Sequence, residues 1–143
     1  MVKKLPIKLF RNIYSKVPRL CVDIIIMQKK EFVLSKRDIP PCKGMWHIPG
    51  GTVIMGESLK EAVKRIAKEE TNLEVSVKKQ LGVREYSRKS AFGQAISVVY
   101  LADALSSKLV GNKFARDVRF FKKIPKNIIK EQRGIMQNVL KMI

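Results

Sequence analysis

The sequence contains few of the residues that build disulfide frameworks or zinc sites. Among 143 residues there are two cysteines, Cys21 and Cys42, and a single histidine, His47. The two cysteines form no CxxC pair and have no histidine cluster beside them, so we expect two reduced thiols.

Long apolar runs and low-complexity segments are also missing. No N-terminal stretch has the continuous apolar core of a signal peptide, and no segment approaches the roughly 18 apolar residues of a membrane span. We therefore expect a soluble, cytoplasmic protein without a membrane partner. With 45% hydrophobic residues and only eight Gly and six Pro, the chain predicts one domain, residues 1–143, with a substantial core.

Acidic residues are scarce compared with basic ones. Twelve Asp and Glu stand against 30 Lys and Arg, which gives a formal net charge of +18. Such a charge on a small domain predicts anionic partners. Residues 1–20 and 106–143 are the most basic regions and could bind nucleic-acid phosphates. A solvated basic surface explains the same pattern, because no run of five like charges and no regular aromatic spacing is present.

Alternating and β-branched segments predict a sheet. Residues 20–27 and 32–36 read as a hairpin. Asp23 interrupts the first apolar run, and antiparallel pairing would bring it near Lys36 or Arg37, either of which would compensate its charge. The remaining expected elements are strands at 73–81, 82–86 and 94–102, a loop entering a strand at 114–121, a short helix within 1–19 and a closing helix at 127–143.

Residues 58–71 give the clearest helix signal. Ser58 and Glu61 form the capping-box pattern, and Asn72 suits a left-handed C-terminal cap. Glu70 falls on the apolar stripe, where a carboxylate has to be paired, protonated or bound to metal. An ordinary amphipathic helix with an Arg65–Glu69 pair is the alternative. The apolar stripe consists of Leu59, Ala62, Val63, Ile66 and Ala67.

The order of residues around this helix is more specific than its periodicity. Gly51, Glu57, Arg65 and the pair Glu69-Glu70 follow the spacing Gly-x5-Glu-x7-Arg-x3-Glu-Glu. The spacing resembles the Nudix box, here residues 51–73. The preceding Trp-His-Ile-Pro-Gly segment is similar to that family's usual approach to its box.

The resemblance implies a fold and a chemistry. The fold would be α/β, a Nudix-type α/β/α sandwich around a mixed sheet. The reaction would be hydrolysis of a nucleoside diphosphate linked to another moiety, with Mg²⁺ or Mn²⁺ as cofactor and a small anionic nucleotide as substrate; a homodimer is one option for its assembly. Glu69, Glu70 and the carbonyl of Gly50 or Gly51 would be metal ligands. The catalytic group would include Glu69, Glu70 and Arg65, while Gly51, Glu57 and Arg65 would shape the box.

Two box positions depart from the family pattern. Ile66 stands where the family has a glutamate that often binds metal or activates water. Asn72 replaces a glycine, which is a mild change because asparagine tolerates the left-handed conformation. An apolar residue at the position of Ile66 is similar to the GDP-mannose mannosyl hydrolase branch, in which water attacks the sugar carbon.

Further residues resemble that branch, namely Asp23, Lys36-Arg37 and the Gly44-Met45-Trp46 segment. This implies that Asp23 and Arg37 lie near the diphosphate, and Trp46 is also a candidate substrate contact. However, Thr52 replaces an arginine of the branch, and the loop at 113–117 lacks its Gln-His pair.

Three functions therefore stay open: hydrolysis at phosphorus, hydrolysis at a sugar carbon, and a catalytically silent domain that binds nucleotide or RNA. Candidates for the general base are Glu69, Glu85 and His47. Candidates for stacking on a nucleotide base are Trp46, Phe92 and Tyr100.

Overall fold

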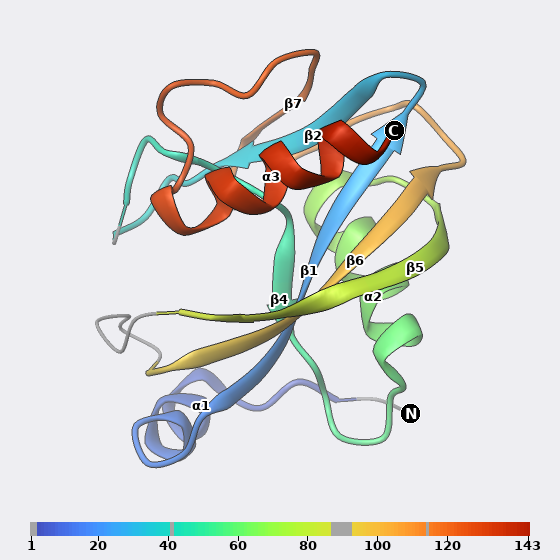
Figure 1. Cartoon of the computed structure of the whole chain (residues 1–143). Coiled ribbons are helices and arrows are strands. Elements are labelled where there is room, and N and C mark those ends of the chain that lie inside the picture. The colour runs from blue at the N-terminus through green and yellow to red at the C-terminus, as the bar shows by residue number, and fades with distance from the viewer. Residues whose placement is uncertain (1–2, 41, 87–92, 114) are drawn as a thin grey trace.

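The computed structural model describes residues 3–40, 42–86, 93–113 and 115–143. These described residues form three helices and seven strands (Figure 1). In order, they are α1 (Ile7–Tyr14), β1 (Arg19–Gln28), β2 (Glu31–Lys36), β3 (Trp46–His47), β4 (Gly50–Thr52), α2 (Leu59–Thr71), β5 (Val75–Glu85), β6 (Ala95–Ala104), β7 (Asp117–Phe121) and α3 (Lys130–Met142).

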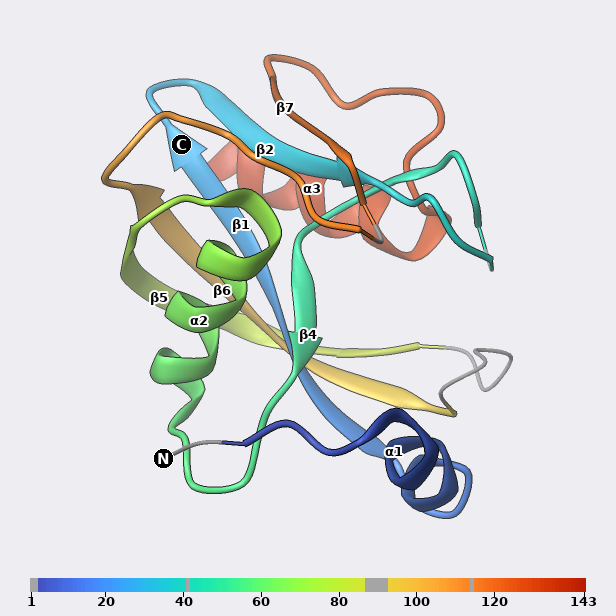
Figure 2. The ribbon, with the colours of Figure 1, turned by 180° about the vertical axis from the view of Figure 1, so that it is seen from behind.

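The strands form one mixed sheet between two helices. β1 runs parallel to β6 and antiparallel to β4, and β6 continues antiparallel to β5. β2 pairs with β1 next to their turn and also with β3 and β7. Figures 1 and 2 show α2 on one side of the sheet and α3 on the other. The expected α/β sandwich around a mixed sheet is confirmed.

β1 supplies side chains to a hydrophobic core on each face of the sheet. Val22, Ile24 and Ile26 pack in the core beneath α2, while Ile25 and Met27 pack in the core beneath α3. A strand buried on both faces has a continuous apolar run instead of an alternating pattern. Asp23 is the charged exception within this run.

The expected surroundings of Asp23 were wrong. Beyond the turn of the β1–β2 hairpin, β4 takes the place beside β1, with Asp23 opposite Gly50. The burial and partners of Asp23 involve neither Lys36 nor Arg37. The reason is that the Pro-Gly-Gly segment forms a short strand that separates the two arms of the hairpin.

Two element boundaries also differ from expectation. The two strands expected at 73–81 and 82–86 are one strand, β5, whose irregular pairing with β6 includes a bulge before Gly82. Gly82 has φ +136°, a conformation that favours glycine and that looked like a strand break in the sequence. Helix α3 starts at Lys130 instead of 127, because the backbone around Ile128 pairs with Trp46.

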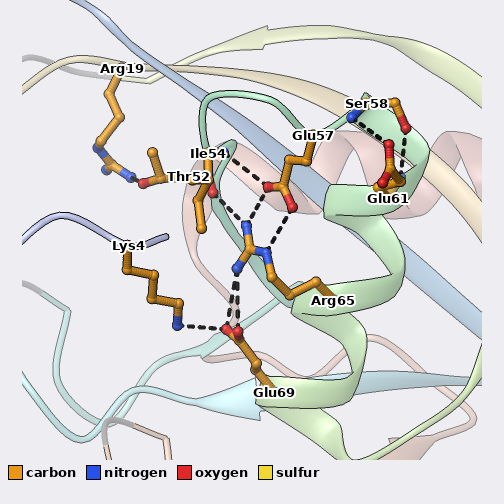
Figure 3. Close-up of polar contacts among 9 residues, drawn as sticks. All are labelled: Lys4, Arg19, Thr52, Ile54, Glu57, Ser58, Glu61, Arg65 and Glu69. Carbon is orange, nitrogen blue, oxygen red and sulfur yellow. Dashed lines mark hydrogen bonds and ion pairs between the residues drawn. The ribbon is translucent and has the colours of Figure 1, made fainter. Parts of the chain in front are cut away.

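The ends of α2 are capped as expected. The Ser58 hydroxyl accepts from the Glu61 backbone at 3.1 Å, and the Glu61 carboxylate accepts from the Ser58 backbone at 3.0 Å (Figure 3). Asn72 ends the helix with φ +67°. Ile66 is 2% exposed and would lie 3.2 Å from a Cβ added to Gly51, so the helix packs closely on the glycine turn.

The capping box predicts a measurable contribution to stability. Replacing Ser58 by alanine removes the acceptor for the first turn of α2 and is expected to lower the free energy of unfolding by about 1 kcal/mol. Urea unfolding measures this change. The matched control is Lys60→Ala in the same turn, and equal stabilities of the two variants would show that the cap contributes nothing.

Candidate active site

Glu57 and Arg65 tie the loop before α2 to the helix. Arg65 Nε donates to Glu57 Oε2 at 3.0 Å, and Arg65 Nη2 donates to Glu57 Oε1 at 2.6 Å and to the Thr52 carbonyl at 2.9 Å. Glu57 also accepts from the Ile54 backbone at 2.9 Å. These contacts hold the pKa of Glu57 below its ordinary value, so its carboxylate stays charged although only 3% of the side chain is exposed.

Glu69 continues this polar chain at the surface (Figure 3). Its carboxylate lies 3.3 Å from Arg65 Nη1 and 2.8 Å from Lys4 Nζ, and 38% of its side chain is exposed. Lys4 belongs to the basic N-terminal segment, which thus reaches the box helix. The guanidinium of Arg65 thus contacts Glu57, the Thr52 carbonyl and Glu69 together.

Glu70 lies one residue further and points toward β4. The backbone N–H of Gly50 donates to its carboxylate, and Arg37 lies close enough to favour its charged form. Burial, with smaller contributions from Glu69 and Asp23, nevertheless raises the pKa of Glu70 to about 7. Because Glu70 lies on the apolar stripe of α2, the positive charge around its carboxylate is too small to offset its burial.

Asp23 is the second carboxylate of this region. It is 7% exposed, and burial raises its pKa to about 6 although the hydroxyls of Tyr86 and Ser97 and the charge of Arg19 lower it. A Cβ added to Gly50 would come 2.3 Å from Asp23 Oδ1. Glycine at this position is therefore required by the close approach of the carboxylate to the β4 backbone.

A buried polar chain connects Asp23 to α3. The Tyr86 hydroxyl donates to Asp23 Oδ2, and Gln132 Nε2 donates to the Tyr86 oxygen at 3.0 Å. Gln132 Oε1 accepts from the Ile48 backbone at 2.6 Å, just before the Pro-Gly-Gly turn. Burial and the neighbouring carboxylate raise the pKa of Tyr86, which keeps it a donor. Sequence reasoning missed Tyr86 and Gln132; a polar residue on the apolar stripe of the last helix was the available signal.

Arg37 lies near Glu70 rather than Asp23. Burial lowers the pKa of its guanidinium, whereas Glu70 raises it. Its Nε and Nη2 also donate to the carbonyls of Ile39 and Pro40, each at 3.3 Å, so the following loop wraps around it. The guanidinium of Arg37 has a planar fork of N–H donors, which is suited to binding the oxygens of a phosphate group.

The expected role of Trp46 as a substrate contact does not fit its position. Trp46 is 6% exposed and packs edge-on against Phe121 with centroids 4.7 Å apart. Lys36 and Arg119 lie 5.7 and 5.6 Å from its ring centroid. The ring is therefore enclosed by its neighbours, so it is part of the core beneath α3. Tyr100 is also buried, at 4% exposure, and Phe92 lies outside the described residues.

The three candidate bases lie in different surroundings. His47 Nδ1 is 2.9 Å from the Ile48 carbonyl, and burial lowers its pKa to about 4, which makes it a weak base. Glu85 is exposed at the end of β5, on the face of the sheet that α2 covers. Glu69 lies beside Glu70 on α2 itself.

The donor set fits a hard divalent cation. Within the described ranges, no three side chains of His, Cys, Asp or Glu converge into a metal cluster. Mg²⁺, however, is commonly held by one or two carboxylates together with water and substrate phosphates. Glu70 suits such an ion, because a nearby cation would offset the burial and repulsion that raise its pKa.

Comparisons with known proteins identify the family of the chain. The family model of the NUDIX domain matches residues 17–126. The chain is 37% identical over 121 residues to an ADP-ribose pyrophosphatase of Methanocaldococcus jannaschii, covering 85% of this chain and 70% of the relative. It is 31% identical over 117 residues to the low-salt glycan biosynthesis protein Agl8 of Haloferax volcanii, covering 81% and 75%.

Solved structures share the fold. A MutT protein from Methanosarcina mazei superposes with a TM-score of 0.77 at 22% identity, covering 90% of this chain and 96% of the other. A NUDIX hydrolase from Nitrosomonas europaea also gives 0.77, at 23% identity, covering 88% and 72%. No helix in the described part of the chain is long and apolar enough to cross a membrane. By its box, its fold and its relatives, the chain belongs to the Nudix family of hydrolases.

Proposed function

We propose that the protein is a divalent-metal-dependent hydrolase of a nucleoside diphosphate linked to another moiety, with water attacking phosphorus. The observation that carries this proposal is Glu70, a carboxylate held against the Gly50 backbone between a second carboxylate and Arg37. The similarity to an ADP-ribose pyrophosphatase makes ADP-ribose the first substrate to test.

The proposed roles are metal binding for the box residues and phosphate binding for Arg37. Glu70 and the carbonyl of Gly50 or Gly51 would hold Mg²⁺ or Mn²⁺, joined by Glu69 if that residue is not the general base. When bound, such an ion stabilises charge on a phosphoryl oxygen and lowers the pKa of a coordinated water. Arg37 would bind the diphosphate and neutralise part of its charge.

Glu69 is the best-placed general base among the candidates. It is more exposed than Glu70 and adjoins it, so it would serve as the base if Glu70 alone of these two glutamates holds the metal. Ile66 leaves no carboxylate at the position that the family commonly uses, because its side chain is buried against Gly51. Hydrolysis by this chain would therefore rest on Glu69 and Glu70.

Attack at a sugar carbon is the second candidate. It is favoured by the similarity to a protein named for glycan biosynthesis and by Asp23, whose carboxylate lies next to Gly50 and would accept a hydrogen bond from a substrate hydroxyl. The same metal and phosphate contacts would serve both reactions.

The role of Glu70 is tested by Glu70→Gln, which keeps the shape of the side chain and removes its charge. We expect turnover of ADP-ribose with Mg²⁺ to fall by about 10² or more. Glu74→Gln is the matched control, because Glu74 is exposed and pairs only with Lys68 among the described ion pairs. Equal activities of the two variants would remove Glu70 from the mechanism.

Glu70 should also make stability depend on pH. Its pKa in the folded protein is about 7, against an ordinary value of 4.5, so folding takes up a proton between these values. This group therefore lowers stability as pH rises through that window. We expect metal-free Glu70→Gln to gain up to about 3 kcal/mol over the wild type between about pH 5 and pH 8, measured by urea unfolding. A constant difference between the two proteins would contradict the burial of this charge.

The site of attack is tested by isotope labelling. Hydrolysis in ¹⁸O-water should place the label in a phosphate product if water attacks phosphorus. Mass spectrometry of the separated products measures this directly. Label in the free sugar would instead establish the second candidate.

A further inference from the structure

The hydrogen bonds of the polar chain from α3 to Asp23 all run in one direction. The Ile48 backbone N–H can only donate, and it donates to Gln132 Oε1 at 2.6 Å. This contact fixes the orientation of the amide, so Nε2 of Gln132 has to be the atom that faces the Tyr86 oxygen, at 3.0 Å. The Tyr86 oxygen therefore accepts from Gln132, and its single proton is left for Asp23 Oδ2.

The members of this polar chain are held inside the protein. Gln132 and Asp23 are both buried. The Tyr86 N–H donates to the Ala95 carbonyl at 3.0 Å, so Tyr86 stays paired with the start of β6 beyond the end of β5. Burial raises the pKa of the Tyr86 hydroxyl, which therefore keeps its proton. Asp23 is thus given one orientation by a donor that does not ionise.

The other oxygen of Asp23, Oδ1, lies against β4. A Cβ added to Gly50 would come 2.3 Å from it. Ser97 is close enough to lower the pKa of Asp23, but its buried hydroxyl forms no hydrogen bond within the described part of the chain. Buried polar atoms normally have partners, so a small group that donates to Oδ1 and accepts from Ser97, such as a hydroxyl or a water, fits this place.

The same glutamine also acts on the glycine turn. Ile48, whose N–H is bound to Gln132, precedes Gly50 by two residues. The Gly50 N–H donates to Glu70, and its Cα lies against Asp23. One side chain of α3 therefore reaches both carboxylates, one through the turn and the other through a tyrosine.

We propose that Gln132 is a positioning residue of the candidate active site, which acts through Tyr86 and holds Asp23 so that Oδ1 is the oxygen presented to the substrate. A charged oxygen in this place accepts a hydrogen bond from a donor group and repels a phosphate. The proposal rests on the proposed function, because it places the substrate beside Asp23. It assigns a role in substrate selection to two residues, Tyr86 and Gln132, that lie far from the box in the sequence.

Ligand binding without turnover tests this role. Metal-free protein is titrated with ADP-ribose by calorimetry at pH 8, where the Asp23 carboxyl, with its pKa of about 6, is charged. We expect Tyr86→Phe and Gln132→Met each to raise the dissociation constant about fivefold, because each removes the fixed orientation of Asp23. The matched control is Tyr100→Phe, since Tyr100 is also buried and its hydroxyl lies 3.2 Å from Gln80 Oε1, an amide instead of a carboxylate. Equal weakening by the two tyrosine variants would overturn the proposal.

The direction of the hydrogen bonds also predicts the behaviour of Asp23→Asn. The Tyr86 proton would bind the amide oxygen, so the amide nitrogen would take the place of Oδ1 and present a donor instead of an acceptor. The dissociation constant of ATP, divided by that of ADP-ribose, should then fall about tenfold.

The same substitution in Tyr86→Phe separates orientation from charge. Without the tyrosine hydroxyl the amide can rotate, so adding Asp23→Asn should lower the ratio by no more than about threefold, which is the effect of the lost charge. Equal falls in the two backgrounds would show that charge alone decides the preference, and would overturn the fixed orientation of Asp23.

A measurement without ligand distinguishes this proposal from the proposed function. The ¹³C resonance of the Asp23 carboxyl at pH 8 reports on its hydrogen bonds. It should move in Gln132→Met, although the bonds of Gln132 go to Ile48 and Tyr86, and it should stay in place in Tyr100→Phe. An unchanged resonance in Gln132→Met would overturn the proposal. If the wild type binds neither ADP-ribose nor ATP, the proposed function fails, and the resonance still decides whether Gln132 orients Asp23. Thermal melting of each variant checks that it is folded.

Discussion

The exclusion of water from two carboxylates, where β4 meets β1, determines the arrangement of the surrounding groups. Gly50 has no side chain because Asp23 lies against its Cα. Its N–H is directed to Glu70, and Arg37 approaches from the end of β2. The Gly50 N–H and Arg37 both lower the free-energy cost of burying the negative charge of Glu70, but they do not cancel that cost. A cation or a phosphate-bound metal complements such a region better than a neutral ligand does.

At position 66 the box helix has a packing residue, Ile66, where the family pattern has a glutamate that can bind metal. Ile66 belongs to the core that also contains Val22 and Ile24, and its side chain contacts the glycine turn. A glutamate at this position would be desolvated in an apolar cluster unless a metal lay beside it. The packing therefore strengthens the connection between helix and loop, while the acidic chemistry is concentrated in Glu69 and Glu70.

Local features were predictable from the sequence, and the assembly of the site was predictable only in part. The cap at Ser58 and the left-handed Asn72 depend on neighbouring residues, so their patterns were sufficient. The place of Asp23 depends on β4, which is three residues long and has too little sequence to signal a strand. Tyr86 and Gln132 come from elements far apart in the chain, and only the folded sheet brings them to one carboxylate.

The link through Gln132 has a consequence for folding. The backbone before the Pro-Gly-Gly turn and the hydroxyl that holds Asp23 both contact a side chain from α3. Until α3 docks on the sheet, the Tyr86 oxygen lacks this donor and the Ile48 N–H lacks its acceptor. Order around the two carboxylates is thereby coupled to the docking of α3.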